Sequence, residues 1–136
     1  MAIESFAVYG VDTDDLPGVT CRGAQDNYQI EVVIVDLGGW QIELLQHHRG
    51  ECVYKDFMAT RGEGVQHLGF FIKNADDYAG ACDEMVRRGY AHVQGDPVVG
   101  KSRNVHFDYF DSTHALGWMV ELLDTPELAD ELQQPG

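Results

Sequence analysis

The chain has 136 residues, of which 44% are hydrophobic, and its 9 basic and 23 acidic side chains give a net charge of −14. This length and composition suit one globular domain with a buried core. The acidic balance argues against nucleic acid or an anionic membrane as a partner, and no apolar run approaches the ~20 residues that cross a bilayer. The N-terminus lacks the basic start and apolar stretch of a signal peptide, so we expect a cytoplasmic protein with three reduced cysteines.

The first half of the sequence predicts three strands. A short strand over 4–10 precedes a loop over 11–27 that is rich in Asp, Gly and Pro. The β-branched segment 28–36 predicts the second strand, and 40–46 predicts the third. The Leu-Gly-Gly segment between them predicts a hairpin turn.

The second half predicts a helix among four strands. A polar connector over 47–64, with a short helix over Val53–Thr60, leads into it. A helix over 75–88 has two N-cap candidates, Asn74 and Asp76, an apolar face and a terminating Gly89. The strands are predicted over 66–73, 90–95, 104–111 and 117–123. The tail from Asp124 is acidic and is expected to form a loose helical turn.

One short phrase occurs twice, 78 residues apart. Residues 39–45 are Gly-Trp-Gln-Ile-Glu-Leu-Leu, and residues 117–123 are Gly-Trp-Met-Val-Glu-Leu-Leu. A repeat at this spacing indicates two copies of one structural unit. The second copy includes a strand and a helix before its last three strands, and the first copy lacks counterparts of both. We therefore expect an α+β fold of two related but unequal units.

Each copy places one carboxylate, Glu43 or Glu121, in an otherwise apolar strand, which is costly unless the charge is paired. Strand alternation puts both opposite Trp40 and Trp118. We expect the tryptophan-bearing faces to meet helices and the glutamates to line a cleft between two sheets. With His67 as a third donor, the set suits Mn²⁺, Fe²⁺, Co²⁺, Ni²⁺ or Zn²⁺. The competing interpretation is two solvent-facing carboxylates and a packed histidine.

A second pair of candidates emerges when the repeats are aligned backwards from their hairpins. Asp36 then matches Asp111, and five residues earlier Glu31 matches His106. Either side chain could act as a general acid or base, because both residue types can be tuned toward neutral pH. The alternative is an ordinary wall residue with a satisfied hydrogen bond.

These segments resemble the vicinal oxygen chelate superfamily, also called the glyoxalase/bleomycin resistance/dioxygenase fold, and in particular methylmalonyl-CoA epimerase-like proteins. The resemblance covers roughly residues 28–124 and rests on the segments 41–46, 50–57, 62–70, 108–111 and 117–123. It implies paired βαβββ modules around a metal, with the ligands Glu43, His67 and Glu121. A fourth ligand, usually a histidine on the first strand of the first module, has no counterpart here. The resemblance also implies an acid/base pair, for which Glu121 and Glu31 are the candidates, and it departs at Gln66, where the family often has a second histidine.

The resemblance divides a single domain into four parts. They are an incomplete first module over 1–46 that lacks its opening strand and helix, a connector over 47–64, a complete second module over 65–124 and an acidic tail over 125–136. A coding start upstream of Met1 is one explanation for the missing part. Its loss would expose a sheet edge and an apolar face, so we expect a homodimer.

We expect a metal-dependent enzyme of the isomerase, epimerase or lyase type. Its substrate would be a small carbonyl or thioester compound that reacts through a metal-stabilised enolate. The alternative is a metal-free protein of the drug-sequestering kind on the same fold, which the missing fourth ligand favours. In that case Tyr28, Phe107 and Tyr109 could line the binding cleft.

Overall fold

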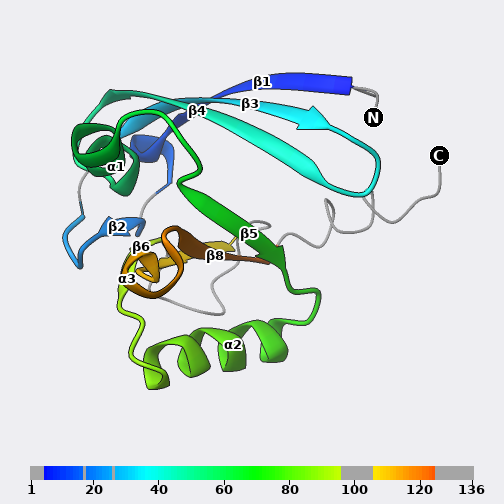
Figure 1. The fold of residues 1–136 in the computed structure, drawn as a ribbon, viewed down its shortest axis with the longest axis vertical. Helices are drawn as coiled ribbons and strands as arrows, with labels where there is room; N and C mark the ends of the chain where they lie inside the picture. The colour runs from blue at the N-terminus through cyan, green and yellow to red at the C-terminus, as the bar shows by residue number, and fades with distance from the viewer. Residues whose placement is uncertain (1–4, 17, 26, 96–105, 125–136) are drawn as a thin grey trace.

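The structure is a computed structural model that describes residues 5–16, 18–25, 27–95 and 106–124. Two sheets face each other, and the expected α+β architecture is confirmed (Figure 1). Sheet A has the order β1–β3–β4, with β1 at Ser5–Asp12, β3 at Gln29–Asp36 and β4 at Gln41–Arg49. Sheet B has the order β2–β6–β7–β8–β5, with β2 at Thr20–Cys21, β6 at His92–Gly95, β7 at His106–Phe110, β8 at Met119–Asp124 and β5 at His67–Phe71.

Sheet A is antiparallel, and its centre is the predicted hairpin of β3 and β4. The two strands pair from Asp36 opposite Gln41 onwards. Gly38 and Gly39 lie in the turn with φ of 71° and 96°, a backbone region that favours glycine. The carboxylate of Asp36 accepts a hydrogen bond from the backbone N–H of Gly38 at 2.9 Å and so stabilises the turn.

The chain from β5 to β8 forms a complete strand, helix, strand, strand, strand unit. Its helix α2 spans Ala75–Arg87, as predicted, and Asn74 caps it by accepting a hydrogen bond from Asp76 N at 2.9 Å. Within this unit β5 pairs with β8 in parallel, while β6, β7 and β8 pair in antiparallel fashion. The short strand β2 was not expected, since the sequence suggested a loop there. It belongs to the first half of the chain but pairs with β6, so it adds an edge strand to sheet B.

Three further short helical segments complete the fold. The helix α1 spans Val53–Arg61, close to its predicted limits. The 3-10 helix η1 at Thr13–Asp15 and the short helix α3 at Thr113–Leu116 were not predicted. Within the described part of the chain, no helix has the length and apolar character needed to span a bilayer.

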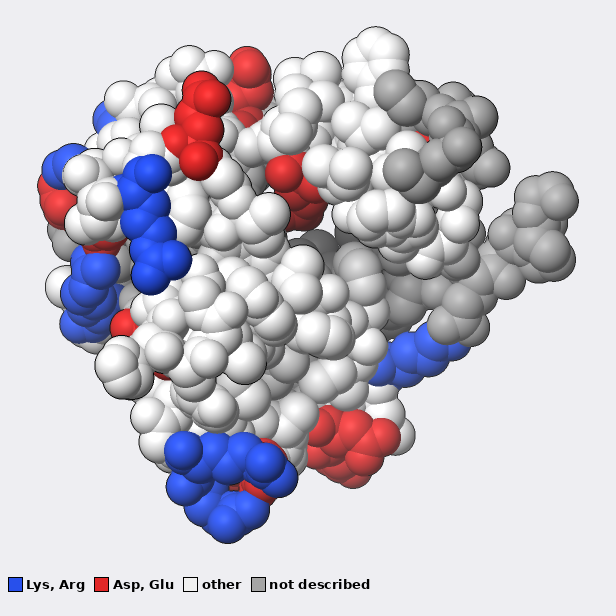
Figure 2. Space-filling model, viewed as in Figure 1, with Lys and Arg blue, Asp and Glu red and all other residues white. Residues whose placement is uncertain are grey.

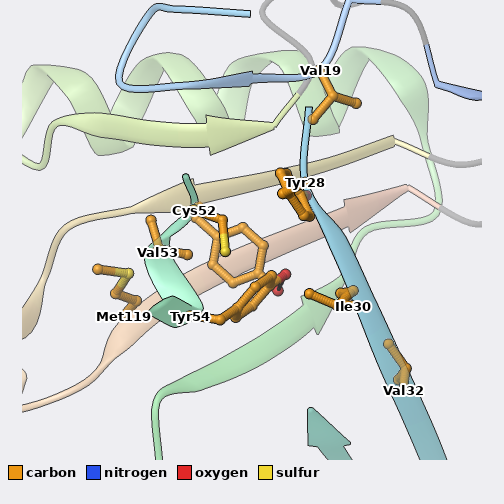
Figure 3. Packing of buried hydrophobic residues seen from close by; sticks show 9 residues of the cluster. Val19, Tyr28, Ile30, Val32, Cys52, Val53, Tyr54 and Met119 are labelled. Atoms are coloured by element: carbon orange, nitrogen blue, oxygen red, sulfur yellow. Dashed lines mark hydrogen bonds between the residues drawn. The ribbon is translucent and has the colours of Figure 1, made fainter. Parts of the chain in front are cut away.

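The space between the sheets holds the main hydrophobic core. Figure 3 shows Tyr28, which precedes β3, and Ile30 and Val32 of β3 on the side of Cys52 and Tyr54, which are the N-cap and second residue of α1. The cluster is completed by Val19, Val53, Tyr109 and Met119. All of these side chains are buried, so α1 closes one end of the space and ties the first half of the chain to the second.

The tryptophan-bearing faces of the two copies differ. In the second copy Trp118 packs with Val120 and Leu122 against Tyr78 of α2, as expected. In the first copy Trp40 is 54% exposed, and no helix covers its face among the described residues. The expectation of a helix layer there was therefore wrong, while the expectation of an exposed apolar face holds.

Some expectations lie outside the described residues. These are the acidic tail over 125–136, residue 4 of the first strand and residues 104 and 105 of the strand that became β7. The three cysteines are all described, and none of them is in a disulfide.

Candidate metal centre

The structure brings Glu43, His67 and Glu121 together from three strands. The imidazole Nε2 of His67 lies 3.3 Å from a carboxylate oxygen of Glu43 and 3.3 Å from one of Glu121. The three donor atoms lie within 4.8 Å of one another. Glu43 reaches the cluster from sheet A, whereas His67 and Glu121 belong to sheet B. The cluster therefore bridges the two halves of the repeat.

The pairing of β5 with β8 explains how the second carboxylate reaches the histidine. Gly69 lies opposite Glu121 in this parallel pair, two residues after His67. A Cβ atom at Gly69 would lie 3.1 Å from Glu121 Oε2 and 2.8 Å from Leu123 Cδ1. Glycine at this position leaves the room in which the Glu121 carboxylate lies beside the strand.

The three side chains differ in their access to water. His67 and Glu121 retain only 9% and 6% side-chain exposure, while Glu43 retains 33%. Burial lowers the pKa of His67, but hydrogen bonds and charges from Glu121 and Glu43 outweigh it and raise the pKa to about 9. Burial raises the pKa of Glu121, against the hydrogen bond from His67. A proton on His67 thus occupies the position between two carboxylates where a cation is electrostatically favoured.

Gln66 sets the orientation of the histidine ring. Its side-chain carbonyl oxygen lies 2.6 Å from His67 Nδ1, and its amide nitrogen lies 3.4 Å from the sulfur of Met119. His67 therefore donates its Nδ1–H to Gln66, which leaves Nε2 directed at the two carboxylates. This is the position at which the sequence departs from the two adjacent histidines of the resembled family, and sequence reasoning did not assign it a role.

Two buried tyrosines form the wall behind the cluster. The Tyr109 ring meets the His67 ring edge to face, with centroids 5.1 Å apart, and Tyr109 lies opposite Glu121 in the β7–β8 pair. Its hydroxyl lies 2.8 Å from that of Tyr54 in α1. Tyr28 and Phe107 contact these two rings from either side. These rings pack together in the core, and a binding cleft lined by them stays a prediction. Tyr54 was missed because its place depends on how α1 packs.

The donor set fits a divalent transition metal. One imidazole nitrogen and two carboxylate oxygens from separate strands converge, and the second nitrogen of the ring is already held by Gln66. Three protein donors would leave positions for water or substrate oxygens. Within the described residues, none of the other histidines belongs to this or any similar group.

The structure places Glu31 on the far side of sheet A. It pairs with Gly10 on β1 and Gln46 on β4, so it shares a face with Leu44 and lies opposite Glu43. It is exposed and does not reach the cluster. Counting across the hairpin from Asp36 and Gln41 would have placed it on that face from the sequence alone.

His106 also lies away from the cluster. It follows the same alternation along β7 as Asp108 and Phe110, which face α2, and its ring lies 6.3 Å from that of Tyr78. Tyr109 has the opposite orientation and faces His67. The backward alignment thus paired equivalent positions, but Glu31 and His106 both lie on the faces of their sheets that point away from the cluster. We therefore assign neither residue an acid/base role.

The chain is similar to a known protein family and to solved structures. A family model described as the Glyoxalase/Bleomycin resistance protein/Dioxygenase superfamily matches residues 2–108. Methylmalonyl-CoA epimerase from Mycobacterium tuberculosis has a similar structure, with a TM-score of 0.52 and 20% identity over 87% of this chain and 79% of that one. A hypothetical protein from Bacillus halodurans C-125 has a TM-score of 0.51 and 20% identity over 70% of this chain and 66% of that one.

At 20% identity these structural likenesses show a common fold and nothing finer. No curated protein matches the chain. The family model, by contrast, spans well over half of the sequence, including β1, β3, β4, β5 and Glu43 and His67 of the cluster. The chain therefore belongs to the Glyoxalase/Bleomycin resistance protein/Dioxygenase superfamily.

Proposed function

We propose that this protein is a metal-dependent enzyme of the isomerase, epimerase or lyase type that acts on a small carbonyl or thioester compound. The observation that carries the proposal is the convergence of Glu43, His67 and Glu121 between the two sheets. The family match supports it, and the epimerase among the structural neighbours suggests the reaction type. The metal would be Mn²⁺, Fe²⁺, Co²⁺, Ni²⁺ or Zn²⁺.

Each residue of the cluster has a distinct task in this proposal. His67 would hold the ion through Nε2, with Gln66 fixing the ring, and both glutamates would contribute oxygens. When bound, the ion supplies a Lewis acid that stabilises negative charge on a substrate oxygen. Burial raises the pKa of Glu121, which makes its ionised carboxylate a stronger base, so this residue is also the candidate to accept a proton from substrate. Glu43, the more exposed carboxylate, lies on the side from which substrate would approach.

Metal analysis tests the proposal directly. Protein purified without chelator should contain a bound divalent ion, and added Mn²⁺ or Co²⁺ should raise the melting temperature of the stripped protein. Epimerase or isomerase chemistry should further show as exchange of a substrate C–H for deuterium in D₂O, dependent on the added ion. Absence of both metal content and thermal shift would contradict the proposal.

A metal-free binding protein is the second candidate, and one observation favours it. Protonated His67 lies beside both carboxylates and offsets part of their negative charge, which an ion would otherwise do. The aromatic lining could then hold an apolar ligand. The variants Glu43→Gln and Glu121→Gln separate the candidates, because a binder would keep its ligand while an enzyme would lose both metal and turnover.

We also infer that two copies associate through the outer face of sheet A. This face presents Phe6, Val8, Leu44, Ile42 and Trp40, which are 71%, 56%, 57%, 39% and 54% exposed. Figure 2 shows a mainly uncharged surface over sheet A, with acidic side chains scattered on it. These apolar side chains are complementary to themselves, so a second copy can cover them through a two-fold axis that keeps the two copies of Glu31, which lies on the same face, apart.

A further inference from the structure

We propose that Tyr54 and Tyr109 form a hydroxyl relay that positions the Glu121 carboxylate for metal binding. The inference rests on the proposed function, because it concerns the same cluster. It adds two positioning residues to the site, and it connects α1 to a metal ligand on β8. Neither tyrosine supplies a metal ligand itself.

The relay is a chain of three side chains from three elements. Tyr54 Oη lies 2.8 Å from Tyr109 Oη. In the proposed relay the Tyr109 hydroxyl donates in turn to the Glu121 carboxylate, whose pKa burial raises and a hydrogen bond from Tyr109 lowers. Tyr109 and Glu121 are direct cross-strand partners, which brings the hydroxyl and the carboxylate to one side of sheet B. The same Tyr109 ring packs edge to face on His67. Tyr109 thus contacts two of the three cluster residues.

The direction of the hydrogen bonds follows from the number of protons available. An ionised carboxylate only accepts, so Tyr109 must donate its single O–H to Glu121. The Tyr109 oxygen is then the acceptor for Tyr54, which donates to it. A tyrosine hydroxyl is protonated at neutral pH, so both side chains are available as donors. All the hydroxyl protons therefore point along the chain toward Glu121.

This polarity has a consequence for a buried ligand. Glu121 is 5% exposed, so water cannot replace a missing donor, and its ionised form depends on protein hydrogen bonds. Donation from Tyr54 polarises the Tyr109 hydroxyl and strengthens its bond to the carboxylate. Partners that orient metal ligands in this way typically contribute a factor of about 10–100 to metal affinity. Glu43 is one third exposed and can be solvated instead.

The opposite face of the same strands offers a matched control. There Tyr78 of α2 donates its hydroxyl to Asp108 at 2.5 Å, and it is as deeply buried as Tyr109. Tyr78 and Asp108 belong to the helix side of sheet B, away from His67. Loss of the Tyr78 hydroxyl therefore removes a similar buried hydrogen bond without touching the cluster.

The experiment compares the full chain with Tyr54→Phe, Tyr109→Phe and the double variant. Co²⁺ binding is titrated by visible absorption, which reports the ligand field as well as the affinity. Tyr109→Phe should weaken binding by about 10–100-fold and alter the Co²⁺ spectrum. Tyr54→Phe should weaken it by a smaller factor, and the double variant should match Tyr109→Phe, because Tyr54 acts only through Tyr109.

Several outcomes would overturn the relay. The first is a loss of Co²⁺ affinity in the double variant that equals the product of the losses in the two single variants. The second is a Tyr109→Phe variant with the same spectrum and affinity as the unaltered chain. The third is a Tyr78→Phe control that weakens Co²⁺ binding as strongly as Tyr109→Phe does. Binding of neither Co²⁺ nor Mn²⁺ by the unaltered chain would overturn the proposed metal function instead. Thermal unfolding without metal then tests the relay. A double variant with the same melting temperature as Tyr109→Phe supports the relay, and melting-temperature losses that add up in the double variant refute it.

Discussion

The two copies of the repeated phrase have nearly the same sequence and different surroundings. On β8, Leu122 is 6% exposed and packs under α2, while its counterpart Leu44 on β4 is 57% exposed. The glutamates differ in the same sense, with 6% side-chain exposure for Glu121 and 33% for Glu43. The comparison teaches that the phrase itself encodes a strand with two distinct faces. The helix α2 decides the burial of the tryptophan-bearing face, whereas the glutamates lie on the other face, in the cluster between the sheets.

The largest expected effect concerns the two carboxylates and the metal. Glu121→Gln should reduce Mn²⁺ or Co²⁺ affinity by more than ~100-fold, because a buried ligand has no solvent substitute. Glu43→Gln should reduce it by a smaller factor, since water can replace an oxygen at the more exposed position. Calorimetric titration measures both. Equal losses would mean that burial does not distinguish the two copies at the site.

The apolar faces give the next effect, on folding. Leu122→Ala should lower the free energy of unfolding by about 3 kcal/mol, as for other buried leucines. The matched variant Leu44→Ala should change the free energy of unfolding of the monomer by less than about 0.5 kcal/mol, because the Leu44 side chain is already exposed to water. Urea denaturation at concentrations low enough to keep the protein monomeric measures both. A large loss in Leu44→Ala would show that something covers sheet A.

Stability of the metal-free protein should depend on pH through His67. Its pKa is raised from 6.5 to about 9 in the folded state, so its stabilising contribution is complete below pH 6.5 and is lost as pH rises through 9. The free energy of unfolding should fall over this window by at most about 3 kcal/mol. Denaturation at pH 6, 7.5 and 9 measures the slope. His67→Gln should abolish it, and a slope that survives this substitution would place its origin elsewhere.

Metal affinity should change in the opposite direction over the same pH window. An ion must displace the proton from His67 Nε2, so affinity should rise by up to tenfold per pH unit toward pH 9. Titrations of Mn²⁺ at several pH values, with the release of about one proton per ion at neutral pH, test this. A pH-independent affinity would mean that the ion binds without displacing the proton of His67, so that this histidine is not a ligand.

The smallest expected effect is on association. The unaltered chain should be a dimer at micromolar concentration, and Leu44→Glu should shift it toward monomer by placing a charge on the outer face of sheet A. Light scattering measures the mass. Val86→Glu on α2 is the control, because Val86 is also 57% exposed but lies on the other side of the molecule. A monomeric unaltered chain would refute the interface.

Much of the fold could be predicted because its signals are local. The hairpin is marked by two glycines between β-branched runs, and α2 by an Asn cap and a glycine stop. The elements that were missed, β2, η1 and α3, are two, three and four residues long. Such short segments have too few residues for a periodic pattern and exist because neighbouring strands hold them.

The candidate site was predictable in part. Glu43 and Glu121 stood out because a charged residue recurs inside an apolar strand, and His67 because imidazole completes a set of donors. Glu31 and His106 were chosen by alignment of the repeats without following strand alternation to the face on which each one lies. Their distance from the cluster is a consequence of the pleat, which sends neighbouring residues to opposite sides.

The sequence by itself determined the longer strands, the principal helix, the duplicated phrase and the three candidate donors. Periodicity, capping and turn residues act over a few positions, so they can be interpreted without knowing the fold. Only the tertiary structure decided that Gln66 orients His67, that Tyr54 and Tyr109 stand behind Glu121, and that Trp40 is exposed while Trp118 is not. These contacts depend on strand register and helix packing, which join residues that are distant in sequence. Burial depends on which element covers a face, and a local sequence pattern does not contain that information.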